Sequence, residues 1–252
     1  MADPTETPAS FFGFLNLPSE LRNGIYELML VHQEPIIPRF GFFRPRLTLG
    51  LLRASKAIHH EASSVLYGRN RFHFSNCGPE VLASFLEQIG TSNAAYIRRV
   101  SIDFPDFLRL SLGRVTLVED SVGLLGTIQS SCTNLSTLET SLGSTSRAVH
   151  RLKYLGNQDV ATEALQLVDA RFRAISSLRD IILEVHEGDL SDHIRQIMKS
   201  HGWTITTSEY VEDEDKDGDD LIPDDFDYDD YGYDDYDYDD DGDGSDGSDD
   251  DD

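Results

Sequence analysis

Apolar residues in the first part of the chain recur every three or four positions, which is the period of an α-helix. The stripe that they form consists of Leu17, Leu21, Ile25 and Leu28. Pro18 stands where the first helical residue is expected, a position that needs no backbone N–H, and Glu20 follows in the first turn. The pattern predicts a helix whose apolar stripe is buried against another part of the protein. On this interpretation, Leu21→Asp would unfold or severely destabilise the N-terminal module.

A second helical pattern follows between residues 51 and 68. One face of this predicted helix carries Leu51, Ala54, Ile58, Ala62 and Val65. Gly68 is suited to the left-handed conformation that often ends a helix. Residues 70–74 then alternate between polar and apolar, which predicts a short, half-buried strand. Between the two helices, residues 34–47 contain three prolines and one glycine, and this composition predicts an inserted two-stranded hairpin.

Three motifs within roughly residues 14–75 carry a family resemblance. Residues 17–22 read LPSELR, residues 59–62 read HHEA, and residues 67–74 read YGRNRFHF. In this order they resemble an F-box, and more closely the F-box-like modules of a large fungal family named for two E-x-R motifs. Glu20-Leu21-Arg22 supplies one E-x-R motif, whereas Glu61-Ala62-Ser63 stands where the second could be expected.

The resemblance implies a module that binds other proteins. In an F-box protein that serves a cullin-type ubiquitin ligase, the module binds a Skp-type adaptor and the rest of the chain recruits a substrate. The residues that would contact the adaptor by this resemblance are Leu17, Pro18, Ile25 and Leu28. Two alternatives stay open at this point. The protein could be an F-box-like scaffold without a ligase role, or an acidic-tailed protein that binds histones or other basic proteins.

The middle of the chain contains three similar segments, residues 97–104, 135–142 and 178–185. Each has an apolar residue at its first, fourth and eighth positions, which is close to the strand pattern of leucine-rich repeats. Helical patterns lie around them at residues 79–90, 115–131, 160–175 and 190–201, and a last short strand is expected at residues 203–206. This alternation predicts parallel strands joined by right-handed crossovers. The region is either an irregular α/β layer with helices on one face, or a degenerate repeat array whose open sheet face binds a partner.

The predicted fold class is therefore α+β, in four parts. Residues 1–10 are expected to be disordered. Residues 11–78 form the helical F-box-like module with its inserted hairpin, and residues 79–210 form the irregular, leucine-rich-repeat-like α/β region. Residues 211–252 form a disordered tail rich in Asp, Tyr and Gly.

Charge is divided very unevenly between these parts. The chain contains 46 acidic and 21 basic residues, for a formal net charge of −25, and residues 211–252 contain 24 of the acids and a single lysine. Residues 1–210 are left with 22 acids and 20 bases. Like charges at the density of the tail repel one another and favour disorder. The tail is either a solubilising segment or a polyanion that binds basic proteins, while the nearly neutral body suggests neither nucleic-acid nor membrane binding.

Catalytic and metal-binding patterns do not emerge from the sequence. Cys77 and Cys132, the two cysteines, can form neither a disulfide framework nor a four-cysteine zinc site. His59 and His60 are adjacent, so on a helix they point about 100° apart and cannot chelate one metal ion. We therefore expect no catalytic residue, no metal and no cofactor, and hence no enzyme. The chain shows no apolar leader and no stretch of about 20 apolar residues, so a cytoplasmic or nuclear location is expected.

Overall fold

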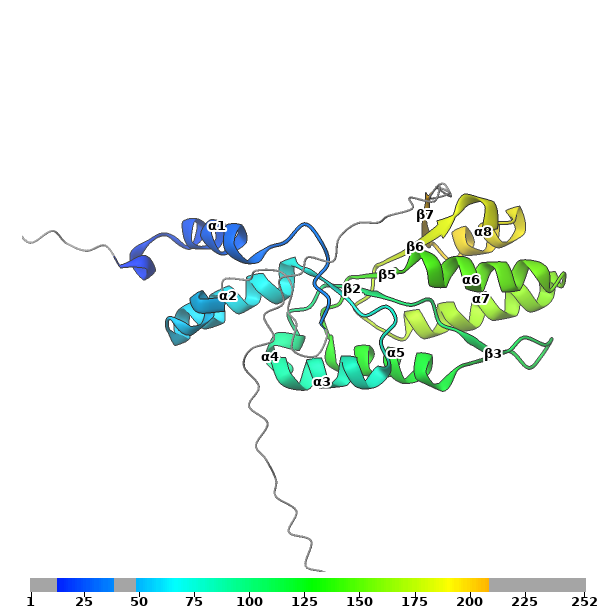
Figure 1. Ribbon diagram of the computed structural model, residues 1–252, viewed down its shortest axis with the longest axis horizontal. Helices are drawn as coiled ribbons and strands as arrows, with labels where there is room; N and C mark the ends of the chain where they lie inside the picture. Colours follow the sequence, from blue (N-terminus) through cyan, green and yellow to red (C-terminus); the bar gives the residue numbers. More distant parts are fainter. Residues whose placement is uncertain (1–12, 39–48, 209–252) are drawn as a thin grey trace, which may run out of the picture. The chain divides into compact units, whose positions relative to one another are not determined.

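The computed structural model of the protein describes residues 13–38 and 49–208 (Figure 1). All of the described residues belong to one compact unit. That unit contains both helices and sheet, which confirms the mixed helix-and-sheet class. The predictions of disorder for residues 1–10 and 211–252 concern segments outside the described residues.

The N-terminal part is helical. Its elements are η1 (Phe14–Asn16), α1 (Ser19–Leu30), η2 (Leu49–Arg53) and α2 (Lys56–Arg69). α2 packs against both α1 and η2, and its N-cap is Ser55, whose Oγ accepts a hydrogen bond from the backbone N–H of Ile58 at 3.2 Å. Both predicted helices are present, but three details of their ends are wrong. Pro18 is the N-cap of α1 rather than its first residue. The second helix starts at Lys56 and not at residue 51, since residues 49–53 form the separate turn η2, and it continues past Gly68 to end at Arg69.

The following region contains a five-stranded sheet. Its strands are β1 (Arg71–His73), β2 (Arg99–Ile102), β5 (Thr137–Thr140), β6 (Asp180–His186) and β7 (Thr204–Ser208). They lie in the order β1-β2-β5-β6-β7, and every neighbouring pair is parallel. The prediction of parallel strands is therefore confirmed for the three similar segments. Spatial order follows chain order, so each strand of this sheet pairs with the next of its strands along the chain.

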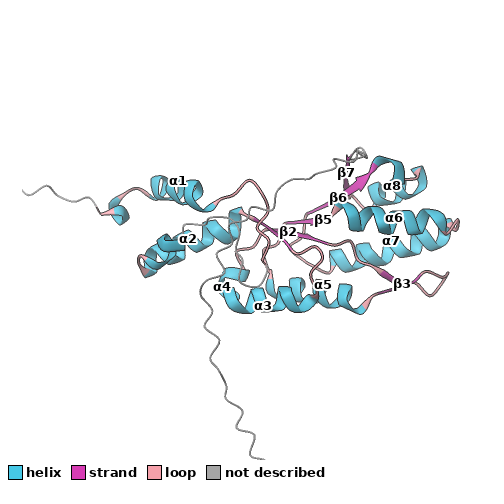
Figure 2. Cartoon of the chain, in the orientation of Figure 1, coloured by secondary structure: helices cyan, strands magenta, loops and turns pink. Residues whose placement is uncertain are grey.

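Helices and one small antiparallel pair fill the connections between the strands (Figure 2). The helices are α3 (Pro79–Ile89), α4 (Thr91–Ala94), α5 (Glu119–Ser131), α6 (Leu142–Tyr154), α7 (Gln158–Arg173), η3 (Glu187–Asp189) and α8 (Asp192–Ser200). The antiparallel pair consists of β3 (Phe107–Arg109) and β4 (Thr116–Leu117). As predicted, α3 begins with a proline and is followed by Gly90, which has a left-handed φ of 78°. The sequence did not predict α6, because a run of Ser, Gly and Thr at its start has low helix propensity.

Alternate strand residues point into one continuous apolar core. Phe72, Val100, Leu138 and Ile181 are aligned across four neighbouring strands, and all are buried. Phe104, which follows β2, Phe172 in the last turn of α7 and Trp203, which directly precedes β7, form an aromatic cluster with ring centroids 5.8 to 6.5 Å apart. The indole N–H of Trp203 donates to Asp169 Oδ1 at 2.9 Å, so this buried ring leaves no unpaired donor.

The predicted insertion extends the sheet at the β1 edge. Ile36 forms a parallel bridge with Phe72. Its backbone N–H donates to Arg71 O at 2.8 Å, and its carbonyl accepts from the N–H of His73 at 2.8 Å. The first half of the insertion thus lies along β1, while residues 39–48, which include the second half of the predicted hairpin, lie outside the described residues.

Candidate functional site

Helix α1 has a buried face and an exposed apolar face. Tyr26 and Leu30 are completely buried, whereas Leu21 is 56% and Leu28 is 88% exposed. At about 100° per residue, these two leucines lie on the side of the helix opposite Tyr26. The expectation that the apolar stripe is buried is therefore wrong, because Tyr26 and Leu30 provide the contact face instead. We call Leu21 and Leu28 the outer stripe.

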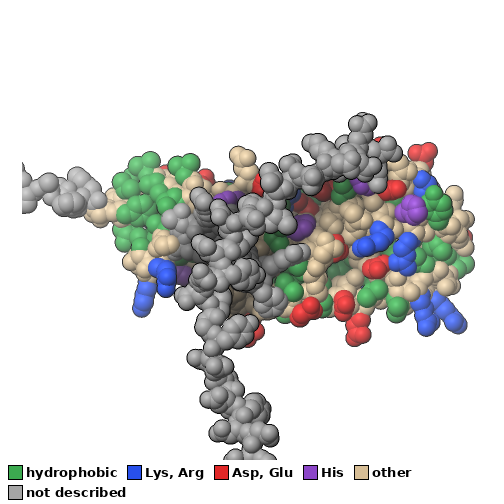
Figure 3. Space-filling model, viewed as in Figure 1, with side chains coloured by type: hydrophobic (Ala, Val, Ile, Leu, Met, Phe, Trp, Pro, Cys, Tyr) green, Lys and Arg blue, Asp and Glu red, His purple; other side chains and the backbone are tan. Residues whose placement is uncertain are grey.

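The four residues proposed to bind an adaptor are divided between exposed and half-buried positions. Pro18 and Leu28 are exposed, and Leu17 and Ile25 are half-buried. Only Leu28 of the four lies in the outer stripe, and its neighbour there, Leu21, was not among them. Figure 3 shows apolar side chains gathered on the part of the surface that α1 and α2 occupy.

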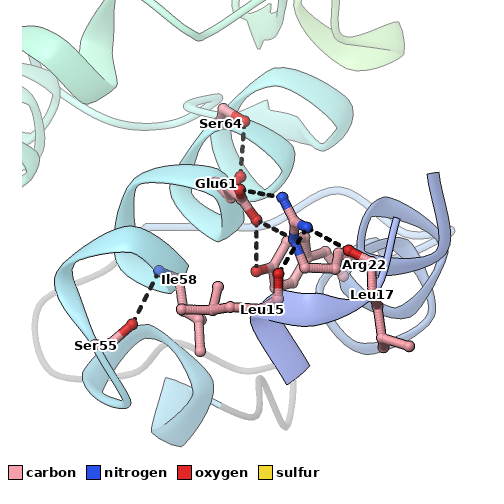
Figure 4. A network of polar contacts seen from close by, with 8 residues as sticks. Leu15, Leu17, Arg22, Ser55, Ile58, Glu61 and Ser64 are labelled. Atoms are coloured by element: carbon pink, nitrogen blue, oxygen red, sulfur yellow. Dashed lines mark hydrogen bonds and ion pairs between the residues drawn. The ribbon is translucent and has the colours of Figure 1, made fainter. Parts of the chain in front are cut away.

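The buried side of α1 is held to α2 by a charged contact, the Arg22–Glu61 clamp (Figure 4). The guanidinium of Arg22 donates through Nε to Glu61 Oε2 at 2.8 Å and through Nη2 to Oε1 at 2.6 Å. Its Nη1 also donates to the carbonyl of Leu17 at 2.6 Å, and the hydroxyl of Tyr26 donates to Glu61 Oε2 at 3.0 Å. Arg22 belongs to the E-x-R sequence of residues 20–22, and Glu61 belongs to residues 61–63, where a second such motif was expected. The contact uses no arginine at position 63.

The clamp keeps Glu61 in its charged form. Hydrogen bonding from Arg22 is the main cause that lowers the pKa of Glu61, with a smaller contribution from Tyr26, while desolvation opposes both. The same hydrogen bond raises the pKa of Arg22, and burial is the main cause that raises the pKa of Tyr26. A carboxylate whose charged form is favoured in this way is a structural partner rather than a proton donor at neutral pH.

A buried amide joins the carboxyl ends of α1 and α2. Asn70 follows α2 and is 1% exposed. Its Nδ2 donates to the carbonyl of Leu30 at 2.7 Å and to that of Leu66 at 2.8 Å, and its Oδ1 accepts from the N–H of His32 at 2.8 Å. The amide thus satisfies two carbonyls that helix ends leave unpaired, and it accepts a hydrogen bond from the backbone N–H of His32, just beyond α1. Asn70, the polar residue directly after the end of the helix, was the available signal, whereas the sequence analysis placed the helix end at Gly68.

The open face of the sheet is polar. Arg71 Nη1 lies 2.6 Å from Glu139 Oε2, and His73 Nδ1 lies 3.0 Å from Ser101 Oγ. Desolvation by burial is the main cause that lowers the pKa of His73, so its ring is neutral at physiological pH. These side chains alternate with the buried core residues on β1, β2 and β5.

A cavity of about 530 Å³ lies where this face meets the start of α6. Asp103, at its edge, accepts hydrogen bonds from Ser141 Oγ at 2.8 Å and from the N–H of Asn76 at 2.7 Å. Ser141 is the N-cap of α6, but its side chain bonds to Asp103 and does not cap the helix. Side chains of both charges and several hydroxyls line the cavity, so it presents both hydrogen-bond donors and acceptors. Within residues 13–38 and 49–208, no group of three or more His, Cys, Asp or Glu residues could hold a metal ion.

Comparison of the chain with protein-family models, curated proteins and solved structures produced no match. Among the described segments, no helix combines the length and the apolar character needed to cross a membrane.

Proposed function

We propose that the protein is a protein-interaction module whose outer stripe on α1 binds a partner protein. The observation that carries this proposal is the exposure of Leu21 and Leu28 on a helix whose opposite face is already held by the Arg22–Glu61 clamp. Burial of an exposed leucine side chain would contribute about 25 cal/mol for each Å² of apolar surface removed from water. A partner that covers the stripe would recover that free energy, which is why such surfaces often mark interaction sites.

The partner that we propose first is a Skp-type adaptor, which makes the protein an F-box-like substrate receptor of a cullin-type ubiquitin ligase. Three motifs in the order of the fungal F-box-like family support this role. Leu17, Pro18, Ile25 and Leu28 remain the proposed adaptor contacts, and the exposure of Leu28 and Pro18 favours these two over the half-buried pair. The leucine-rich-repeat-like sheet would recruit the substrate through its open face. This role requires no catalytic residue and no cofactor, and it places the protein in the cytoplasm or nucleus.

The second candidate is an F-box-like scaffold in which the outer stripe binds another protein. The geometry of α1 favours this role equally, because two exposed leucines define an apolar surface but not the identity of its partner. A third candidate depends on residues 211–252, whose 24 acids would bind histones or other basic proteins.

A binding experiment with the full chain separates these functions. We expect a purified Skp-type adaptor to bind in isothermal titration calorimetry with a Kd of roughly tens of micromolar or tighter. Leu28→Asp should weaken this binding at least tenfold. Leu112→Asp is the matched control, because Leu112 is 62% exposed and lies outside α1, and it should have no effect.

Each other outcome selects a different function. A folded wild-type chain that does not bind the adaptor at this concentration would end the ligase proposal and leave the scaffold. A pull-down of histones by the full chain, lost when residues 211–252 are removed but retained in Leu28→Asp, would favour the acidic-tail function.

A further inference from the structure

Three arginines line a single groove between the helical part and the start of the sheet. The groove encloses about 680 Å³, and its charged lining residues are Glu27, Arg69, Arg98 and Arg99. They come from α1, from the end of α2 and from the start of β2. We call it the arginine groove.

Of the three arginines in this groove, one is paired with an acid. Arg69 is paired with Glu27 at 3.4 Å, and both side chains are largely exposed. Arg98 and Arg99 form no ion pair within the described part of the chain. Arg99 also lies directly across the sheet from Arg71, an arrangement of like charges that destabilises a strand pair. Arg71 is engaged by Glu139, so the charge of Arg99 remains available to a ligand.

The formal charges along the groove point to an anion. Three arginines and one glutamate give the lining a net charge of +2, whereas residues 1–210 as a whole carry 22 acids and 20 bases. The positive charge is therefore a local concentration and not a property of the whole body. A phosphate monoester carries a charge of about −1.5 to −2 at pH 7, which matches this lining. A guanidinium group can also donate two parallel hydrogen bonds to two oxygens of one phosphate, a geometry that the lysine ammonium cannot provide.

We propose that the arginine groove binds a phosphorylated serine or threonine on a partner protein. A single phosphate suits a site that is positive only locally. A long polyanion such as nucleic acid would experience the repulsion of a chain with a formal charge of −25. The floor of the groove is held in place by its own hydrogen bonds. Ser136 Oγ donates to the carbonyl of Arg98 at 3.1 Å, and Tyr96 Oη lies 3.2 Å from His60 Nε2. Binding in this groove does not require the proposed adaptor contact, since neither Leu21 nor Leu28 lines it.

The first test uses a small probe and the full chain labelled with ¹⁵N. Phenyl phosphate is added while the arginine Nε–Hε signals are followed by NMR. We expect the signals of Arg98 and Arg99 to shift in a saturable way, and that of Arg109, an exposed arginine on β3, to remain in place. Lack of a selective shift at concentrations of about 20 mM, well above a millimolar Kd, would overturn the proposal.

The second test measures specificity with labelled peptides of about ten residues, each built of Gly, Ala and Ser around one central residue. Fluorescence anisotropy compares a central phosphoserine with serine and with glutamate. We expect Arg98→Gln and Arg99→Gln each to weaken phosphoserine binding at least tenfold, and Arg109→Gln, which removes the same charge elsewhere, to change it less than twofold. Binding should also weaken below about pH 6, where the phosphate accepts its second proton.

Three results would contradict the proposal. The first is that the glutamate peptide binds as tightly as the phosphoserine peptide, and the second is that Arg109→Gln causes the same loss of binding as Arg99→Gln. The third is that a single-stranded RNA of similar length binds more tightly than the phosphoserine peptide. Thermal unfolding of each variant is the folding control. The side chains of Arg98 and Arg99 are exposed, so the melting temperatures should remain close to that of the wild type.

Discussion

The helical part and the sheet region distribute their apolar and polar residues in opposite ways. In the sheet region, aromatic and aliphatic side chains fill the interior and polar side chains cover the open face. In the helical part, an arginine, a glutamate and an asparagine form internal contacts, while Leu21 and Leu28 point outward. The difference shows that an apolar stripe in a sequence identifies a surface that is favourable to bury. The surface that buries it can belong to the same chain or to another protein. It also means that the two regions should respond differently to the same kind of mutation.

The largest effect is expected in the aromatic cluster of the sheet region. Phe172 is completely buried, with its ring 5.8 Å from that of Trp203 and 6.5 Å from that of Phe104. Phe172→Ala should lower the free energy of unfolding by about 3–5 kcal/mol, because it removes apolar burial and leaves a cavity. Urea denaturation measures this loss. Tyr154→Ala is the control, because Tyr154 is 73% exposed, and equal losses in the two variants would show that the cluster is not the core.

A smaller loss is expected when the internal amide of the helical part is removed. Asn70→Ala deletes three hydrogen bonds and leaves buried backbone groups unpaired, so we expect a destabilisation of about 1–3 kcal/mol in the same measurement. Asn134→Ala is the comparison, because Asn134 is exposed and its amide makes a single bond of 2.8 Å to Ala95 O. If the two variants lost the same stability, the buried amide that links the ends of α1 and α2 would contribute no more to stability than an exposed amide with one hydrogen bond.

The clamp should make stability depend on pH on the acid side. The pKa of Glu61 is lower in the folded protein than the ordinary value of 4.5. The stabilising contribution is therefore complete above pH 4.5 and is lost as pH falls through the lower, folded pKa. Glu61→Gln should lower the melting temperature by several degrees at neutral pH and reduce its further decline in acid. Glu20→Gln, an exposed change at the start of α1, should retain the acid decline of the wild type, and an unchanged decline in Glu61→Gln would refute the link.

The smallest effects on stability are expected on the outer stripe. Leu21→Asp and Leu28→Asp should each change the free energy of unfolding by less than about 0.5 kcal/mol, since both side chains already face solvent. Leu30→Asp is the matched control on the same helix. Leu30 is completely buried, so an unpaired carboxylate there should be severely destabilising. Equal losses at all three positions would mean that the outer stripe is buried after all.

Local patterns were enough to predict most of the secondary structure. Prolines, glycines and apolar repeats within a few residues of one another predicted the helices α1, α2 and α3 and the strands β2, β5 and β6. These elements are present in the structure. Helix α6 was missed because Ser144, Thr145 and Ser146 are buried in its first turns, where small polar residues imitate a loop. Thr145 Oγ1 lies 2.7 Å from Thr140 Oγ1, and Ser146 Oγ accepts from the N–H of His186 at 2.9 Å. These contacts with β5 and β6 offset the low helix propensity.

The candidate site was predicted less well than the fold. The motif around Leu17 and Pro18 identified the correct helix, but the period of 3.6 residues shows only which side chains share a face, and not which face is covered. The partnership of Arg22 and Glu61 spans 39 positions, and no local rule connects residues so far apart. The arginine groove likewise requires the end of α2 to meet the start of β2.

By itself, the sequence determined where most of the helices and strands form, and it divided the charge between a nearly neutral body and residues 211–252. Both properties depend on residues that are close together along the chain. The tertiary structure alone decided that Leu21 and Leu28 face outward, that Glu61 pairs with Arg22, and that Arg69, Arg98 and Arg99 share one groove. The physical reason is packing. The burial of Tyr26 and Leu30 fixes the orientation of α1, and that orientation determines the direction of every other side chain of the helix.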